Sequence, residues 1–225
     1  MGGAIDFLRA AISSLLTRRM LAPAVVLAVL LTVSNIVVLL YKPTPGTMPL
    51  PFIVAAVIRV LGLVAMTVAI LRILNPGPRP VWRPDGGFWL YGLTLLVTMV
   101  AAALAGFAIA GQDDPVGGFF VSLAVTAVTA PLGPWFVAIA VERPLAWRPG
   151  PWLRRFGAWL PWLLLWNLLL IAPLGEIHGA LGRWLATGAG GWFWPVALFD
   201  GPFSAAMALL GLALASVAYR RVARA

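Results

Sequence analysis

Long apolar segments alternate with short polar links along the chain. Six of these segments hold roughly 20 mainly apolar residues each, about the length that an α-helix needs to cross a bilayer. They cover residues 20–41, 50–74, 88–111, 117–141, 156–174 and 196–219. The links are rich in proline and glycine, as expected where helices stop. The pattern predicts an all-α fold in which residues 1–225 form a single integral membrane domain, a polytopic bundle of six transmembrane helices.

Proline and the remaining apolar positions add detail to this outline. Pro131 and Pro134 lie inside the fourth segment, so we expect a kink in that helix. Outside the six segments, two short stretches each have one apolar helical face, which is typical of amphipathic helices on a membrane surface. The first covers residues 4–20, with apolar positions at Leu8, Ile12, Leu15 and Leu16. The second lies between the last two spans, with apolar positions at Ile177, Leu181 and Leu185 beside His178 and Arg183.

The composition supports lipid as the solvent of this fold. Hydrophobic residues make up 62% of the chain and charged residues 10%, with a mean hydropathy of +0.97. Soluble domains carry about 25% charged residues, and a chain of 225 residues has too much surface to hide this apolar area from water. There is no cysteine, which excludes disulfides and thiolate metal sites.

The basic residues predict the orientation. The formal charge is +9, but the charges cluster at the ends of apolar segments and form no basic face, which argues against nucleic acid as a partner. Thirteen arginines fall on one side of the predicted bundle, and only Lys42 and Arg183 fall on the other. Cytoplasmic links carry the excess of basic residues, so both ends are predicted inside (N-in and C-in), facing anionic headgroups. The thirteen are Arg9, Arg18, Arg19, Arg72, Arg79, Arg83, Arg143, Arg148, Arg154, Arg155, Arg220, Arg221 and Arg224.

Two features bear on the location of the protein. Fifteen of the 16 basic residues are arginine, and the chain is also rich in alanine, glycine and proline, as in proteins from GC-rich bacterial genomes. The first apolar run has 22 residues, longer than the roughly 7–15 residues of a signal-peptide core, so we expect it to be retained as a span. The expected location is the bacterial cytoplasmic (inner) membrane.

Arg59 is the main ionisable residue inside a predicted span. It lies nine residues into the second segment, about 14 Å along a helix and close to the midplane of a ~30 Å core. An unpaired arginine at this depth costs about 2.5–3.5 kcal/mol, so we expect it to face the bundle and to have a partner. Asp200 is the best candidate, and the adjoining Gly201 and Pro202 predict a break in the backbone before the last helix.

Three further polar residues fall at similar depths in other spans. They are Asn35, Thr126 and Asn167. Together with Arg59 and Asp200 they predict one polar layer in the outer half of the bundle. This layer has two interpretations: a small outward-facing pocket that binds a substrate or an ion, or a buried ion pair with helper hydrogen bonds that locks the helices together.

The sequence offers little catalytic chemistry. His178 is the one histidine, and Glu176 is two residues away, so on a helix the two side chains point apart and make a poor metal pair. No metalloprotease motif, phosphate-binding loop or nucleophile elbow is present. The adjacent Asp113 and Asp114 are most simply explained as solvated loop residues. We therefore expect no catalytic residues, metal or cofactor, and no enzymatic activity.

The stretch from residue 139 to residue 165 resembles a known group. It reads IAVER at 139–143, LRRFGAW at 153–159 and LLL at 163–165, which is an acidic link followed by an Arg-aromatic turn that opens the fifth helix. In these features it resembles the bacterial six-helix membrane proteins related to the membrane domain of glycerophosphodiester phosphodiesterases and, more distantly, YIP1-like proteins. The resemblance implies a membrane domain without the soluble catalytic domain of that group's enzymes.

Two classes of function remain. The first is a non-catalytic integral membrane protein that organises lipid or partner proteins, or serves as an accessory membrane subunit. The alternative is a small transporter or channel with an outward-facing polar pocket around Arg59 and Asp200. The expected partners are the lipid bilayer and its anionic headgroups on the cytoplasmic face. Small-residue ladders in the third and sixth segments also suit a homo-oligomer or a larger membrane complex.

Overall fold

The computed structural model describes residues 3–41, 44, 46–110, 115–154, 159–188 and 190–223, and within these ranges the chain is helical, with no strand. An all-α fold is therefore confirmed. The helices in chain order are α1 (Ala4–Leu15), α2 (Arg18–Leu40), α3 (Leu50–Leu74), α4 (Gly86–Ala110), α5 (Pro115–Thr129), α6 (Gly133–Val141), α7 (Gly150–Arg154), α8 (Leu160–Trp166), α9 (Ala172–Gly188) and α10 (Phe193–Ala223).

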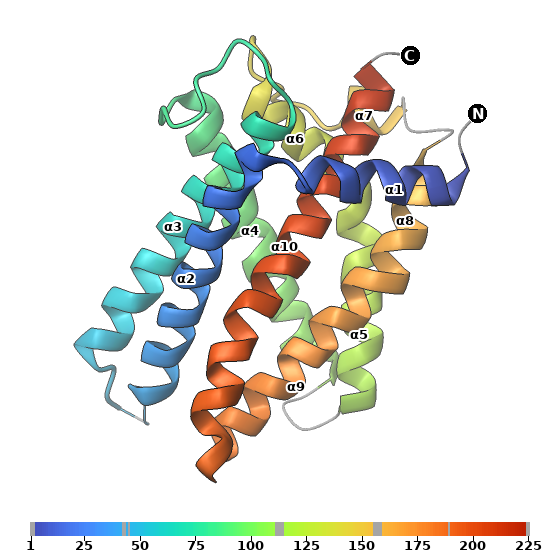
Figure 1. Cartoon of the computed structure of the whole chain (residues 1–225). Coiled ribbons are helices and arrows are strands. Elements are labelled where there is room, and N and C mark those ends of the chain that lie inside the picture. Colours follow the sequence, from blue (N-terminus) through green and yellow to red (C-terminus); the bar gives the residue numbers. More distant parts are fainter. Residues whose placement is uncertain are drawn as a thin grey trace.

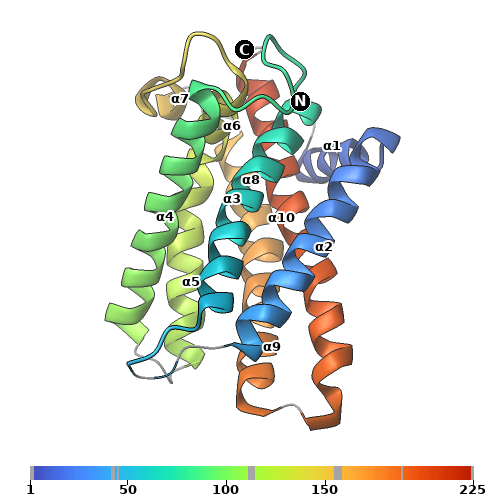
Figure 2. The same ribbon diagram turned by 90° about the vertical axis from the view of Figure 1, so that its left-hand side faces the viewer.

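Five helical stretches are long and apolar enough to cross a membrane, judged by length and composition. They are Arg18–Leu40, Leu50–Leu74, Phe119–Val141, Leu160–Gly188 and Gly190–Ala223. This count covers the described residues. Within α4, the apolar stretch Gly86–Ala101 is shorter than these five and is not counted among them. The long helices run side by side, and both termini lie at the same end of the bundle (Figure 1 and Figure 2). A multi-pass α-helical membrane protein is therefore confirmed.

Two of the long helices change their winding inside the bundle. Between α5 and α6 the chain tightens into a 3-10 turn at Ala130–Leu132, where proline predicted a kink. Between α8 and α9 it widens into a π-helix at Asn167–Ile171. The N–H of Ala172 bonds to the carbonyl of Asn167, five residues back. The wider turn accommodates Pro173 next in the chain, so α9 continues the same helix.

The prediction of a separate surface helix between the last two spans was wrong. α9 extends the fifth apolar segment, so that one helical stretch runs over Leu160–Gly188. Apolar residues recur every four positions both in a helix that lies on a lipid surface and in a helix that packs with one side against another helix, so the repeat does not distinguish the two. Here it reflects packing near α10: Leu185 is buried in a cluster with Ala197, whereas Ile177 is 49% exposed.

α10 passes through Gly201 and Pro202 as one 31-residue helix, so the expected backbone break was also wrong. Proline removes one backbone hydrogen bond, but α10 packs against α1, α2, α6 and α9 along its length. At Gly201 an added Cβ would overlap the hydroxyl of Thr32 on α2 and lie 2.6 Å from its Cα. Glycine at this position allows α10 to approach α2 closely.

α1 lies across the end of the bundle that holds the termini, next to α10 (Figure 1). The helix was predicted, but its main buried face was not. Phe7 and Ala11 are fully buried, whereas Ile12 and Leu16 are 44% and 81% exposed. The prediction assumed one apolar environment, while α1 has two. Its Phe7 side packs on the protein, and a second apolar side with Ile5 faces outward.

Candidate functional site

Polar side chains from four helices form one hydrogen-bond chain inside the bundle. Arg59 on α3 donates from Nη1 to Asn35 Oδ1 on α2 at 2.6 Å. Asn35 Nδ2 donates to Asp200 Oδ2 on α10 at 2.7 Å. The other carboxylate oxygen, Asp200 Oδ1, lies 2.7 Å from His178 Nδ1 on α9. Of the five residues predicted to share a polar layer, the structure thus brings together Arg59, Asn35 and Asp200.

Asn35 separates the two charges of this chain. Its amide oxygen accepts from the guanidinium and its amide nitrogen donates to the carboxylate. If the amide were flipped, its NH2 group would face the guanidinium, donor against donor, and its oxygen would face the carboxylate, acceptor against acceptor. The two neighbours therefore fix its orientation. Asn35 and Asp200 are buried, and Arg59 is partly buried. A buried carboxylate needs such donors, because burying an unpaired charge is very costly.

His178 connects the carboxylate to Ser204 and to the bundle surface. Ser204 Oγ lies 3.0 Å from the same Nδ1 that faces Asp200. An ionised Asp200 only accepts, so Nδ1 carries the hydrogen that faces it. A Ser-His-Asp triad needs the serine on Nε2 and the carboxylate on Nδ1, so these three side chains are not arranged to activate the serine. The His178 side chain is 30% exposed.

Helical spacing and one glycine set this geometry. Asp200 and Ser204 are four residues apart on α10 and therefore share a face, which is the face that meets His178 of α9. Gly201 follows Asp200 and packs on Thr32, three residues before Asn35. The close approach of the two backbones at Gly201 brings Asn35 within hydrogen-bond distance of Asp200.

Asn167 and Thr126 lie away from this chain. Both line a separate cavity of about 280 Å³ between α3, α4, α5, α6, α8 and α10. Asn167 donates from Nδ2 to Leu163 O of its own helix at 2.8 Å. They were assigned to the layer of Arg59 by depth alone, and helices with polar groups at one depth can present them to different sides of a bundle.

Two members of the chain, His178 and Ser204, were missed by sequence reasoning. It placed His178 on a surface helix and did not include Ser204 in the polar layer. A signal was available: the midpoint between positions 178 and 200 falls inside the glycine-rich stretch 188–191. Interpreting that stretch as the turn of a helical hairpin places His178 and Asp200 at the same level.

A second charged network lies at the end of the bundle that holds the termini. Arg72 Nη2 and Arg79 Nη1 each lie 2.7 Å from an oxygen of Asp85. Arg72 Nε also donates to Ala140 O at 2.9 Å, and the N–H of Phe88 donates to Asp85 Oδ1 at 3.1 Å, which caps α4. Burial by itself would raise the pKa of Asp85, but hydrogen bonds from Arg79, the Phe88 N–H and Arg72 outweigh it, and the pKa lies below its usual value.

The arginines used to predict orientation therefore have different environments. Arg72 and Arg79 are buried in the network around Asp85. The guanidinium of Arg221 lies over the rings of Phe7 and Trp159, 5.2 and 4.3 Å from their centroids. Six others are exposed: Arg9, Arg18, Arg19, Arg83, Arg143 and Arg148. They belong to α1, the start of α2 and the links that follow α3 and α6, and these segments lie at the end with the termini (Figure 1). Several charged residues named from the sequence lie outside the described residues: Lys42, Asp113, Asp114, Arg155 and Arg224.

These features define a multi-pass α-helical membrane protein with an intramembrane hydrogen-bond chain. Comparison with protein-family models, with curated proteins and with solved structures finds no match to the chain. The resemblance to the six-helix, YIP1-like group stays a prediction, and residues 155–158 that help carry it lie outside the described ranges. In the part of the chain that the structure describes, no three His, Asp or Glu side chains are grouped to hold a metal ion.

Proposed function

We propose that this chain is a non-catalytic integral membrane protein that binds and organises lipid, alone or as an accessory subunit of a larger complex. It crosses the bacterial cytoplasmic membrane six times with both ends inside. α4 supplies the sixth crossing, since its 25 residues extend about 37 Å along a helix. Both termini at one end of the bundle (Figure 1) agree with an even number of crossings.

The observation that carries this proposal is that protein groups already satisfy the intramembrane carboxylate. Asp200 is 2% exposed, and its two oxygens face Asn35 and His178. A transport site must leave its charged group free for the solute in at least one state. Polar groups that bind one another across four helices instead favour a fixed bundle, in which the chain from Arg59 to His178 acts as a lock.

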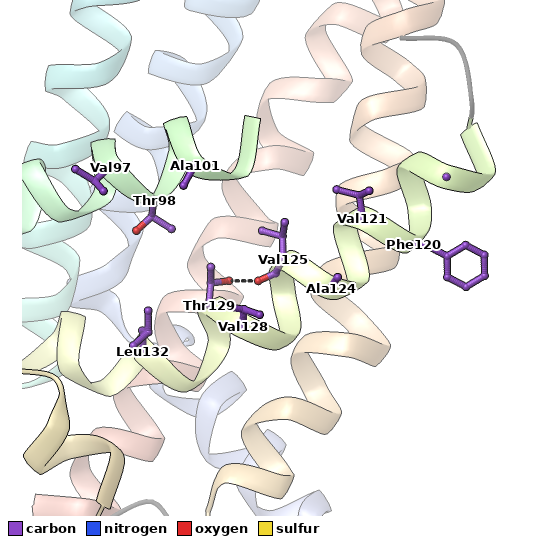
Figure 3. Close-up of a pocket in the computed structure, with 11 residues that line it drawn as sticks. Val97, Thr98, Ala101, Phe120, Val121, Ala124, Val125, Val128, Thr129 and Leu132 are labelled. Carbon is purple, nitrogen blue, oxygen red and sulfur yellow. Dashed lines mark hydrogen bonds between the residues drawn. The ribbon is translucent and has the colours of Figure 1, made fainter. Parts of the chain in front are cut away.

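The surface of the bundle supports a role directed at lipid. A hollow of about 610 Å³ lies between α4 and α5, and another of about 550 Å³ lies between α2 and α3. Both are lined almost wholly by apolar side chains, and Figure 3 shows the first. Hollows of this size and chemistry suit lipid chains.

The exposed arginines at the start of α2 would contact the polar headgroups of lipids whose chains occupy the hollows. Arg18 and Arg19 form the first turn of α2, and both are exposed. The helix dipole disfavours cations at a helix N-terminus, so these residues do not stabilise the helix. Lipid phosphates of the cytoplasmic leaflet provide their counter-charge, worth about 1 kcal/mol per arginine near the surface.

Lipid capture tests this proposal. The full chain is placed in nanodiscs of equal phosphatidylglycerol and phosphatidylcholine, and native mass spectrometry counts the lipids that stay bound. We expect the anionic lipid to be retained preferentially, and Arg18→Gln with Arg19→Gln to reduce the preference by up to about 30-fold, the equivalent of two arginine contacts. Arg183→Gln, at the opposite end, is the control and leaves it unchanged. Equal retention of both lipids by the wild type would overturn the proposal.

One observation favours the alternative of a small transporter or channel. His178 is 30% exposed and touches the buried Asp200, so it links the carboxylate to the outer part of the bundle. Proton flux into vesicles that hold a pH-sensitive dye separates the two functions. Flux no higher than in protein-free vesicles supports the lock, whereas flux that disappears in His178→Leu establishes the transporter.

A further inference from the structure

The cavity of about 280 Å³ adjoins the surface hollow between α4 and α5. Thr98 on α4 and Thr129 on the last turn of α5 line both spaces. In Figure 3 these two threonines come from the two helices that border the hollow. The shared lining places the cavity beside the bilayer, behind the hollow between α4 and α5.

The lining of the two spaces restricts the charge of an occupant. The outer hollow is apolar apart from its threonines, whereas the inner cavity adds Thr126, Asn167 and Tyr91. Among the described residues that line either space, none is charged. An ionised group would find no counter-charge there, and burying an unpaired charge is very costly. The occupant is therefore uncharged.

The hydrogen bonds already made within the cavity restrict it further. The hydroxyls of Thr98 and Thr129 each donate to the carbonyl four residues earlier, at 2.8 Å, and Figure 3 shows the second of these bonds. A hydroxyl has one hydrogen, so both oxygens are left as acceptors. Asn167 uses one N–H on its own helix, which leaves its carbonyl oxygen and a second N–H. A ligand group that both donates and accepts, such as a hydroxyl, complements this set.

Irregular turns of two helices border the cavity. The 3-10 turn contributes Ala130, and the π-helix contributes Asn167 and Ile171. π-helical turns occur frequently at functional sites. Gly211 on α10 leaves further space, since the nearest atom to an added Cβ, Ile171 Cδ1, is 4.0 Å away. The cavity of about 280 Å³ is roughly nine times the volume that a water molecule takes in the liquid.

We propose that this cavity binds an uncharged lipid with a free hydroxyl, such as a long-chain alcohol or a diacylglycerol. The hydroxyl lies among Asn167, Thr98 and Thr129, and the chain extends into the apolar hollow between α4 and α5. This inference deepens the proposed lipid-binding function and rests on it. It names the lipid class and places the site apart from the arginines that contact anionic headgroups.

Photolabelling of the full chain in nanodiscs tests the site. The probes are hexadecanol with a diazirine in its chain and the matching methyl ether, which cannot donate a hydrogen bond. We expect the alcohol to label peptides from α5 and α8 about two- to tenfold more strongly than the ether, the effect of one hydrogen bond. Thr129→Val keeps the shape of the side chain, removes one of the three polar partners and lowers the ratio of alcohol labelling to ether labelling. Thr94→Val, which removes a similar helix-bonded hydroxyl outside the cavity lining, leaves labelling unchanged.

A second pair of variants tests the space itself. Gly211→Val places an isopropyl group in the cavity and lowers labelling, whereas Gly182→Val, where an added Cβ meets nothing within 4 Å, does not. Equal labelling by the two probes, or wild-type labelling of Gly211→Val, overturns the inference. Phospholipid retention in the same nanodiscs separates the two proposals. Retained phosphatidylglycerol without alcohol labelling rejects the cavity site alone, and loss of both rejects the lipid function as well.

Discussion

Gly201→Ala should separate α10 from α2 and break the intramembrane chain. The new Cβ would overlap the Thr32 hydroxyl and lie 2.6 Å from Thr32 Cα, about 1 Å short of an ordinary carbon contact. Because Cα belongs to the backbone, the helices must move apart by about that distance. The 2.7 Å bond from Asn35 to Asp200 then exceeds hydrogen-bond range. Overpacking costs about 1–3 kcal/mol and the loss of a hydrogen bond to a charged group costs about 1.5–3 kcal/mol, so we expect a loss of stability of about 2.5–6 kcal/mol.

The free energy of unfolding is measured in mixed micelles by titration with sodium dodecyl sulfate, followed by tryptophan fluorescence. Gly182→Ala is the matched control, because an added Cβ there meets nothing within 4 Å, and it should gain up to about 1 kcal/mol from helix propensity. Adding Thr32→Gly to Gly201→Ala removes the hydroxyl and Cβ but leaves Cα, so stability should recover only in part. A Gly201→Ala protein as stable as the wild type would refute the close packing of α10 on α2.

Further predictions concern the network at the other end and the topology. Asp85→Asn should lower stability at neutral pH by about 3–5 kcal/mol, because it leaves the buried Arg72 and Arg79 without their anion. The pKa of folded Asp85 lies below its unfolded value of about 3.9, so its stabilisation is complete above that pH and is lost as the pH falls through the folded pKa. Unfolding curves from pH 7 to pH 3 should therefore show a smaller acid loss in Asp85→Asn, and equal losses would contradict the pairing. The chain has no cysteine, so single cysteines report topology without background. An impermeant maleimide should label Thr187→Cys in intact cells and Ser13→Cys only after lysis; the opposite result would reverse the orientation.

Apolar length located the helices well where a helix is apolar on nearly all sides. The second apolar segment, residues 50–74, coincides with α3 at both ends. The same reasoning was less successful for α1 and α9, whose polar and apolar positions are mixed. Hydrophobicity alone does not distinguish a protein neighbour from lipid, so the buried face of α1 and the continuity of α9 depended on contacts with α10.

The depth of polar residues along their helices correctly predicted that Arg59, Asn35 and Asp200 lie together. A polar group near the midplane needs a partner at its own depth, and this relation links Arg59, Asn35 and Asp200. Depth does not specify direction around the helix axis, so Asn167 was assigned to the wrong neighbours. The place of His178 depended on where the chain turns between α9 and α10, which the apolar pattern did not reveal.

Whether the intramembrane charges lock the bundle is tested most directly by a double-mutant cycle of Arg59→Leu and Asp200→Leu. Asp200→Leu should lower the free energy of unfolding by about 3–5 kcal/mol, since it leaves a charge without its partner. Arg59→Leu should cost less, because the carboxylate of Asp200 that remains still faces its two hydrogen-bond partners, Asn35 and His178. If the two act through Asn35 as one unit, the double variant loses less than the two single losses added together, by about 0.5–3 kcal/mol. Additive losses, or an Asp200→Leu protein as stable as the wild type, would contradict the lock.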